Sequence, residues 1–313
     1  MKIIGMIPVY NDEDIIEEII QHHIAEGLDL VILDNGSSDQ TLEMCKKYVG
    51  NGVLQVDQYL TNSYVSEWDT LLRMLYDMAL VHSPDWVIRN DSDEFLESGV
   101  SNLTLKEAIE KADSEEFNLI QFDRFDFFMT DKDNVDEKSI RKKMPYYTYH
   151  GDFLYRAWKY SPGIRISQPA VGHYPIFPEN LKYKIYPKKF VMRHYPYRNK
   201  EQARQKIRGR IRASKSTKTD DALNAHIENI IKQDFTQKFD HKKLNLYEEG
   251  KINYELNFHP YMDKIPPRRE EIFSEEGFLR VKSKTPYQLN LESHQMKKKS
   301  IKFRIKKRLF NLK

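Results

Sequence analysis

The chain has 313 residues, 40% of them hydrophobic with 19 Tyr and 16 Phe, which is enough to bury a sizeable core and excludes a disordered chain. Its single cysteine, Cys45, excludes an internal disulfide and a cysteine-cluster zinc site, and fits a reducing cytoplasm. The net charge is only +3, and the basic excess lies in the C-terminal half, which indicates an anionic partner there rather than a general affinity for nucleic acid.

The first 130 residues alternate predicted strands and helices. Apolar runs, typical of strands covered on both faces, predict strands at residues 2–9, 28–33, 52–56, 86–88 and 118–128. Helical spacing of apolar residues predicts helices at residues 15–20, 64–82 and 104–112, and another after the second strand. Two capping boxes, Ser37 with Gln40 and Thr104 with Glu107, predict helix starts. The alternation predicts an α/β fold with a doubly wound sheet and a site along the carboxyl ends of its strands.

The second half of the chain gives weaker patterns. Residues 132–143 are charged and poor in apolar residues, so we expect a loop. Aromatic-rich segments broken by Pro and Gly predict short antiparallel strands at residues 146–159 and 164–177, and a further strand begins at residue 190. Asn199 and Gln202 predict the start of a helix that continues to about Ser214, and another helix is expected at residues 221–233.

An acidic turn follows the predicted strand at residues 86–88. Residues i and i+2 of an extended backbone point the same way, so Asp91 and Asp93 are expected to aim two carboxylates at one point. Hard oxygen ligands at the end of a strand suit Mg²⁺ or Mn²⁺ shared with substrate phosphates. A solvated surface turn is the alternative that these residues alone leave open.

Three motifs on alternating elements resemble family 2 glycosyltransferases of the GT-A fold. They are Pro8-Val9-Tyr10-Asn11-Asp12-Glu13, Asp34-Asn35-Gly36-Ser37-Ser38-Asp39, and Asp91-Ser92-Asp93, which matches the DxD motif of that fold. The resemblance covers residues 1–130 well, and more weakly residues 172–173 and 193–199, which resemble a bacterial surface-glycan subgroup.

This resemblance implies a GT-A type, Rossmann-like mixed sheet and a division of the chain. The GT-A domain would span residues 1–235, with a nucleotide-sugar-binding half at 1–130 and an acceptor-side half at 131–235. A C-terminal helical extension would cover residues 236–296, followed by a basic tail at 297–313.

The resemblance also implies metal-dependent transfer of a sugar, with inversion, from a nucleotide-diphosphate-sugar donor to a glycan or lipid-linked acceptor. The donor pocket would be lined by Pro8, Tyr10, Asn11, Asp34, Asn35, Asp91, Ser92, Arg193 and Arg198. Asp34 would contact the base or ribose, and Asp91 the ribose or a metal-bound water. Asp93, with Asp91 and His194, would hold Mn²⁺ or Mg²⁺, which neutralises the charge on the departing diphosphate. His173 is the alternative histidine, and Lys200 and Arg204 are further candidates for phosphate contacts.

An inverting transfer also needs a carboxylate that takes the proton of the acceptor hydroxyl. Related enzymes commonly supply it from a Glu-Asp pair beyond the DxD strand, and no such pair appears here. Asp152 and Asp126 are the candidate bases, with nothing in the sequence to choose between them. The Gln-x-x-Arg-Trp motif of processive synthases is also absent, so we expect one sugar to be added per encounter.

Two other activities fit the sequence less well, and one alternative stays open. A nucleotidyltransferase would open with a Gly-rich loop containing Arg or Lys, whereas residues 5–13 have one Gly and neither cation. A haloacid-dehalogenase phosphatase would carry Thr or Val where Phe95 stands. A catalytically inactive glycan- or membrane-binding protein of the same fold is the open alternative.

Residues 297–313 alternate cations with large apolar residues. Ile301, Ile305 and Leu309 fit one helical face, and such a basic amphipathic helix binds an anionic membrane surface. No apolar run approaches the roughly 20 residues of a membrane-spanning helix, and the N-terminus does not resemble a signal peptide. We therefore expect a cytoplasmic protein, peripheral on the inner face of the plasma membrane, with a solubilising tail as the alternative. No nucleic-acid module accompanies the tail, so nucleic acid is not an expected partner.

Overall fold

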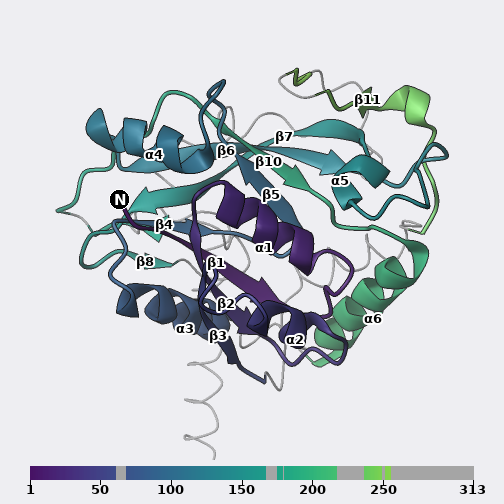
Figure 1. Ribbon diagram of the computed structural model, residues 1–313, viewed down its shortest axis with the longest axis horizontal. Coiled ribbons are helices and arrows are strands. Elements are labelled where there is room, and N and C mark those ends of the chain that lie inside the picture. The colour runs from purple at the N-terminus through teal and green to yellow at the C-terminus, as the bar shows by residue number, and fades with distance from the viewer. Residues whose placement is uncertain (61–67, 167–174, 179, 217–235, 249–250, 255–313) are drawn as a thin grey trace, which may run out of the picture.

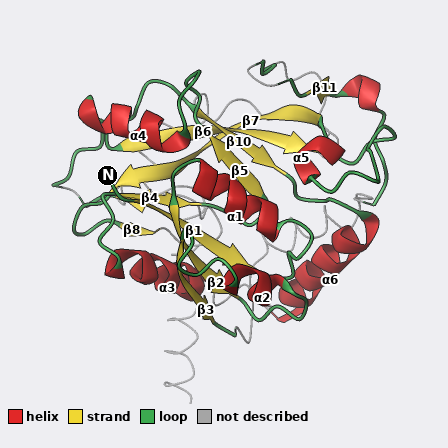
Figure 2. Ribbon diagram, viewed as in Figure 1, coloured by secondary structure: helices red, strands yellow, loops and turns green. Residues whose placement is uncertain are grey.

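The chain folds around one mixed β-sheet with helices packed against it (Figures 1 and 2). The computed structural model describes residues 1–60, 68–166, 175–178, 180–216, 236–248 and 251–254, without the side chains of 68–69, 151–153 and 209–216. The strand order is β3-β2-β1-β4-β7-β6-β10-β5, and β11 pairs with β7.

The elements have the following bounds. The strands of the main sheet are β1 (Ile3–Val9), β2 (Asp29–Asp34), β3 (Val53–Gln58), β4 (Trp86–Arg89), β5 (Glu94–Glu97), β6 (Leu119–Phe127), β7 (Tyr146–Lys159), β10 (Phe190–His194) and β11 (Asn245–Leu246). A small sheet pairs β8 (Arg165–Ile166) with β9 (Pro175–Ile176). The helices are α1 (Ile16–Ala25), α2 (Thr41–Lys46), α3 (Trp68–Val81), α4 (Leu105–Ser114), α5 (Ile140–Lys143), α6 (Lys200–Ser216) and the 3₁₀ helix η1 (His241–Lys243).

The directions of the strands bring the polar loops to one edge of the sheet. β1 is parallel to both of its neighbours, β2 and β4. β7 is antiparallel to β4 and to β6, and β10 is parallel to β6, so β4, β6 and β10 run in the same direction as β1. The carboxyl ends of these strands therefore meet at the same edge. The predicted α/β fold with a mixed sheet is confirmed.

Burial on both faces explains why the first strands are almost entirely apolar. All seven residues of β1 are buried, and so are Ile16, Ile19 and Ile20 of α1. Each fully buried isoleucine contributes about 2 kcal/mol to folding. The apolar runs and the helical spacing of isoleucines in the sequence are thus the two halves of one core.

The order of the strands reverses direction at β1. The chain moves from β1 through β2 to β3 and then returns to β4, on the other side of β1. Because such crossovers are right-handed, α1 and α2 cover one face of the sheet and α3 covers the other. The loops that leave β1 and β4 diverge at this point, which is where ligands bind in open α/β sheets.

Most helix starts and ends follow the predictions, with one clear exception. The capping box of Thr104 and Glu107 is confirmed at the start of α4. The box of Ser37 and Gln40 is wrong: Gln40 precedes α2 without a side-chain cap, and the Ser37 hydroxyl accepts a hydrogen bond from the Asn11 backbone N–H at 2.9 Å. A tertiary contact therefore replaces the local one.

The second half of the chain differs from the predictions in detail. The expected loop at 132–143 ends in the short helix α5, and β7 is a single strand of 14 residues rather than a short one. β5 was not expected, because its partner, β10, follows it by about a hundred residues of chain. In the predicted C-terminal extension, the described part contributes η1 and β11. The predicted helix at 221–233 and the basic tail at 297–313 lie outside the described residues.

Within the described residues, none of the helices combines the length and apolar character needed to cross a lipid bilayer.

Candidate active site

Asp12 joins the loops that leave β1 and β4. Its carboxylate accepts hydrogen bonds from the Ser92 hydroxyl at 2.6 Å and from the Tyr10 backbone N–H at 3.2 Å. Its own backbone N–H donates to the Thr41 hydroxyl at the start of α2, at 2.8 Å. Burial raises the pKa of Asp12, although the cations of Arg198 and Lys206 oppose that shift. Asp12 thus joins the loops at the reversal point of the sheet, where the candidate site lies.

Arg198 links the loop after β1 to the segment that follows β10 through ion pairs. Its guanidinium contacts Asp14 through two bonds of 2.7 and 2.9 Å and Asp12 at 3.1 Å, and it is 1% exposed. Burial alone would lower the pKa of Arg198, but Asp14 and Asp12 raise it. The expected phosphate contact of Arg198 is not what this geometry provides, because these carboxylates occupy the guanidinium.

The motif after β2 is a loop closed by hydrogen bonds, and it forms a shelf beside the loop after β1. The buried Asp34 carboxylate accepts from the backbone N–H groups of Gly36 and Ser37, both at 3.0 Å, and from the Gln58 amide at 2.9 Å. Asn11 adopts a left-handed φ of 52°, which Asn tolerates, and its side chain accepts from the Ser38 N–H at 2.8 Å. Hydrogen bonds therefore join the loops after β1 and β2.

The remaining residues of the first two motifs lie along the same edge. The Asn35 backbone N–H donates to the Val9 carbonyl at 2.9 Å, and Pro8 is buried within β1. Tyr10 is 48% exposed, and Leu60, which follows β3, is 67% exposed. A Cβ at Gly36, where φ is 78°, would lie 2.7 Å from a Leu60 methyl group. This part of the edge therefore combines apolar surface with polar loop backbone.

The two aspartates of the DxD motif contact different partners. The Glu94 backbone N–H bonds to the Asp91 carbonyl at 3.2 Å, so the segment is a turn and not an extended backbone. Asp91 pairs with Arg89 at 2.7 Å and with Arg156 at 3.3 Å, and Arg156 also pairs with Glu94. Because both arginines are buried, they hold Asp91 on their side of the turn. Asp91 thus has arginine partners of its own, and the expectation that both carboxylates meet at one metal stays a prediction.

Asp93 faces two groups, one from β10 and one from α6. The Lys206 ammonium of α6 lies 2.5 Å from its Oδ2, and Nε2 of His194 lies 3.8 Å from its Oδ1. Asp93 is only 5% exposed. Burial by itself would raise the pKa of Asp93, but Lys206 and His194 outweigh burial and lower it to about 2. Asp93 is therefore a buried carboxylate that stays ionised.

His194 is oriented by a carboxylate on the neighbouring strand. Nδ1 of His194 lies 2.7 Å from Oδ1 of Asp126, which also contacts Arg124 at 3.1 Å. When the imidazole is neutral, a proton on Nδ1 donates to Asp126 and leaves the lone pair of Nε2 on the side of Asp93. Nε2 of His150 lies 3.8 Å from the other oxygen of Asp126. Asp126 thus sits behind His194 in the order carboxylate, imidazole, carboxylate.

Asp93 and His194 are the residues at this site that could hold a divalent cation. The two ligand atoms lie 3.8 Å apart, so they would have to move closer together to occupy neighbouring positions around an octahedral ion with bonds of about 2.0–2.2 Å. A carboxylate in front of an imidazole that is backed by a second carboxylate is the usual arrangement at a protein metal site. Two protein ligands suffice where phosphate oxygens and water supply the others. The imidazole nitrogen favours Mn²⁺ over Mg²⁺.

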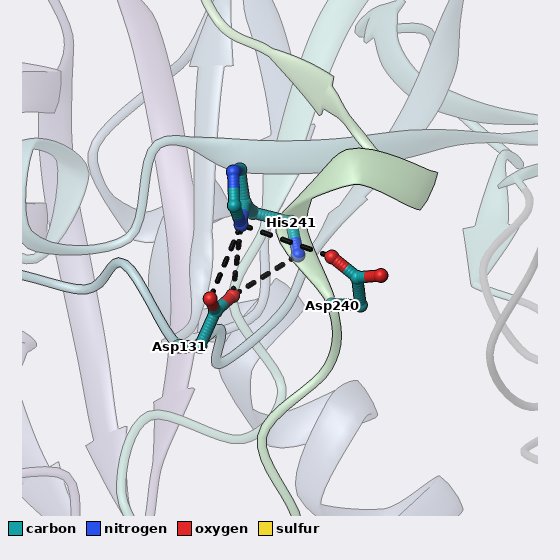
Figure 3. Close-up of side chains that lie close together, drawn as sticks. All are labelled: Asp131, Asp240 and His241. Carbon is teal, nitrogen blue, oxygen red and sulfur yellow. Dashed lines mark hydrogen bonds and ion pairs between the residues drawn. The ribbon is translucent and has the colours of Figure 1, made fainter.

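A separate cluster of potential metal ligands does not include Asp93 or His194. Asp131, Asp240 and His241 form the one set of three potential ligands within 4.8 Å found in the described part of the chain (Figure 3). Both carboxylates are about half exposed, and Nδ1 of His241 lies 3.0 Å from Asp131. Asp240 also caps η1 through the Lys242 N–H at 3.0 Å. The solvated contacts attach η1 to the loop after β6.

The other predicted site residues lie away from Asp93 and His194 or outside the residues that the structure describes. Arg193 pairs with Glu97 and lies 4.5 Å over the Tyr247 ring, while the next residue, His194, faces Asp126. Lys200 and Arg204 are exposed on α6. The Asp152 side chain and all of His173 lie outside the described residues.

Four residues of this region were not predicted to have a role: Asp12, Lys206, Asn90 and His23. Asp12 stood within the first motif, so its position was visible although its contacts were not. Lys206 is 113 residues from Asp93, and a basic residue on a basic helix gives no local signal. His23 lies on the buried face of α1, where a core histidine is the simplest interpretation.

Asn90 and His23 hold the acidic turn in place. The Asn90 amide donates to Nε2 of His23 at 3.2 Å and to the Glu94 carbonyl at 3.1 Å. Nδ1 of His23 lies 2.8 Å from the Ile19 carbonyl, so the neutral ring with its proton on Nδ1 satisfies both contacts. Burial lowers the pKa of His23 to about 4. Protonation of His23 would place a donor against the Asn90 amide.

We predict that His23 makes the protein less stable in acid. Its pKa is lower in the folded state, about 4, than in an unfolded chain, about 6.5, so the unfolded state takes the proton first. The stability is complete above pH 6.5 and falls by about 3 kcal/mol as the pH drops to 4. Urea unfolding at several pH values measures this loss. His23→Gln should flatten the dependence, with His82→Gln as the control, and an unchanged dependence in His23→Gln contradicts the assignment.

Comparison with known proteins identifies the family. The model of glycosyltransferase family 92 matches residues 3–259. The motifs had suggested family 2, and the match corrects the family while supporting sugar transfer over nucleotidyl transfer. A search of curated proteins found no match.

Several solved structures resemble the chain at low identity. Staphylococcus aureus TarS 1–349 is 19% identical, with 74% of this chain and 69% of that chain covered and a TM-score of 0.38. Glucosyl-3-phosphoglycerate synthase from Mycobacterium tuberculosis, in complex with Mn²⁺ and UDP-glucose, is 21% identical over 40% of this chain and 43% of that chain, with a TM-score of 0.27. The mannosyltransferase Ktr4p of Saccharomyces cerevisiae is 12% identical over 40% of this chain and 38% of that chain, with a TM-score of 0.24. These similarities carry no argument about the activity of this chain.

Proposed function

The chain belongs to glycosyltransferase family 92, and we propose that it takes its sugar from a nucleotide-diphosphate donor bound where β1, β2, β4 and β10 end. The observation that carries this proposal is the buried, ionised Asp93 opposite His194, with Asp126 behind the imidazole. A buried charge is costly to maintain without a function or a partner. Its position at the reversal point of the sheet is where a diphosphate would lie.

The nucleoside would occupy the shelf formed by the first two motifs. Tyr10 offers an exposed aromatic ring, and the loops of Asn11, Asp34 and Asn35 offer backbone groups for the base and ribose. Asp91 and Ser92 would lie between the nucleoside and the diphosphate, with Asp91 at the ribose. Pro8 supports this shelf from within β1, and Arg198 supports it through Asp12 and Asp14.

The diphosphate would lie against Asp93 and His194, which would hold Mn²⁺ or Mg²⁺. That cation supplies positive charge to the departing nucleoside diphosphate, which gains negative charge in the transition state. Asp93 stays ionised because of the cations around it. Asp126 keeps the His194 ring in the orientation and the tautomer that such binding needs.

The acceptor hydroxyl attacks the anomeric carbon as the bond to the diphosphate breaks, and a carboxylate takes its proton. Such a base contributes about 10²–10⁴-fold to the rate. Asp126 is engaged by His194 and Arg124, so we assign it to positioning and retain Asp152 as the candidate base. We propose inversion, with single rather than processive addition of a hexose.

Composition supports a proposal for the acceptor and the cellular location. We propose a glycan or lipid-linked acceptor of a bacterial cell-surface polysaccharide, with the protein in the cytoplasm and peripheral on the inner face of the plasma membrane. The alternation of cations and apolar residues in 297–313 supports the membrane contact.

We predict that one nucleoside diphosphate stabilises the protein only when Mn²⁺ is present. A ligand at 100 times its Kd adds about 2.7 kcal/mol, which raises the Tm by about 5 °C in a chain of this size. A thermal-shift panel of UDP, GDP, ADP and dTDP, with and without Mn²⁺, measures the gain. Asp93→Asn should abolish it, and Asp136→Asn, on an exposed loop, should retain it.

A gain without metal, or one that survives in Asp93→Asn, contradicts the proposed site. A metal-dependent gain without any turnover of the matching nucleotide sugars would instead identify a catalytically inactive binding protein.

We predict that Asp126→Asn weakens Mn²⁺ binding by about 10–100-fold, because the carboxylate no longer fixes the His194 tautomer. Titration of Mn²⁺ in the presence of the nucleoside diphosphate, followed by electron paramagnetic resonance, measures this affinity. Asp123→Asn changes another buried carboxylate of β6, which contacts Tyr149 at 3.1 Å, and serves as the control. An unchanged Mn²⁺ affinity with a large loss of kcat would make Asp126 the base.

A further inference from the structure

α6 is held at its start so that one of its cations reaches Asp93. The Asn199 side chain caps the helix by accepting from the Gln202 N–H at 2.9 Å, and Arg198 anchors the preceding residue to the loop after β1. Ala203 is fully buried in the core. Lys206 lies nearly one turn further along α6, next to the partly buried Ile207 that packs on the core. The position of Lys206 is thus fixed by tertiary contacts and not by chance exposure.

The Lys206 ammonium lies at the candidate site, in contact with Asp93 and Pro196. It lies 2.5 Å from Oδ2 of Asp93 and 3.3 Å from the Pro196 carbonyl, with its side chain 27% exposed. An ammonium has three N–H donors. The hydrogen bonds of Lys206 within the described residues use two of these donors, and Nζ also lies 5.9 Å from the centroid of the Tyr197 ring.

The other cations of the basic segment are placed differently. Arg198 is occupied by Asp12 and Asp14, and Arg193 by Glu97. Lys200 and Arg204 are exposed on the outer side of α6. Among the described residues of this segment, Lys206 is therefore the cation that contacts Asp93.

We propose that Lys206 binds the terminal phosphate of the donor's diphosphate and acts as a second, protein-supplied positive charge beside the metal site. This inference rests on the proposed function. Asp93 separates the two cationic positions, since its Oδ1 faces His194 and its Oδ2 faces Lys206. A phosphate that bridges them would meet positive charge from both sides. Fixed charges in a site of low exposure stabilise a leaving anion without reorganisation.

The assignment differs from a purely structural role, in which Lys206 only neutralises Asp93. A ligand to the terminal phosphate distinguishes a nucleoside diphosphate from a monophosphate. A residue that only supports Asp93 affects the metal site itself. The ratio of the two affinities therefore separates the roles without any measurement of turnover.

The test is isothermal titration of UDP and UMP, with saturating Mn²⁺, into the full chain. GDP and GMP replace them if the thermal-shift panel selects guanine. We expect Lys206→Gln to weaken UDP binding by about 10-fold or more, the effect of losing one charge-assisted hydrogen bond, and to leave UMP within about 2-fold. Arg204→Gln, on the exposed face of the same helix, is the matched control and should change neither affinity.

The outcomes are distinct. If the wild-type chain binds none of the nucleotides, the proposed function fails, and this inference with it. If the wild-type chain binds UDP but Lys206→Gln loses UDP and UMP equally, or loses neither, Lys206 is not a phosphate ligand. Should Lys206→Gln fail to fold, Lys206→Arg keeps the charge beside Asp93 but moves its donors. The UDP to UMP affinity ratio must then change, and an unchanged ratio overturns the proposal.

Discussion

The structure depends on keeping one buried carboxylate, that of Asp93, charged. A carboxylate that is 5% exposed would normally take up a proton, because burial penalises the ionised form. Lys206 and His194 prevent this and lower the pKa of Asp93 to about 2. Each comes from the chain beyond residue 190, so the site exists only when the last strands and α6 are in place.

The fold serves this requirement by converging strands that are distant in sequence. Asp93 follows β4, Asp126 lies on β6, and His194 ends β10, 68 residues after Asp126. The strands run in the same direction, so their side chains meet at one edge. Arg198 completes the arrangement, because its bonds to Asp12 and Asp14 attach the start of α6 to the loop after β1. Loss of that buried arginine would leave unpaired carboxylates at a cost of about 3–5 kcal/mol.

The sequence predicted the parts of this structure that local patterns determine. Apolar runs located β1, β2 and β4, and the motifs located the loops that carry Asp12, Asp34 and Asp93. It did not predict features that depend on distant partners. β5 forms because β10 pairs with it, and the Ser37 hydroxyl contacts Asn11 in place of capping α2.

The different partners of Asp91 and Asp93 have the same origin. The i, i+2 rule assumed an extended backbone, whereas Asn90 and the two buried arginines close the segment into a turn. The role of Lys206 could not be predicted for a related reason, since nothing in the composition of α6 distinguishes the cation that contacts Asp93 from those that face solvent.

The most direct test is a crystal structure with Mn²⁺ and the nucleoside diphosphate, with the metal located by its anomalous scattering. The account predicts one strong peak between Oδ1 of Asp93 and Nε2 of His194, in contact with the diphosphate. A peak only at Asp131, Asp240 and His241, or a bound nucleotide with no metal at Asp93, would contradict it.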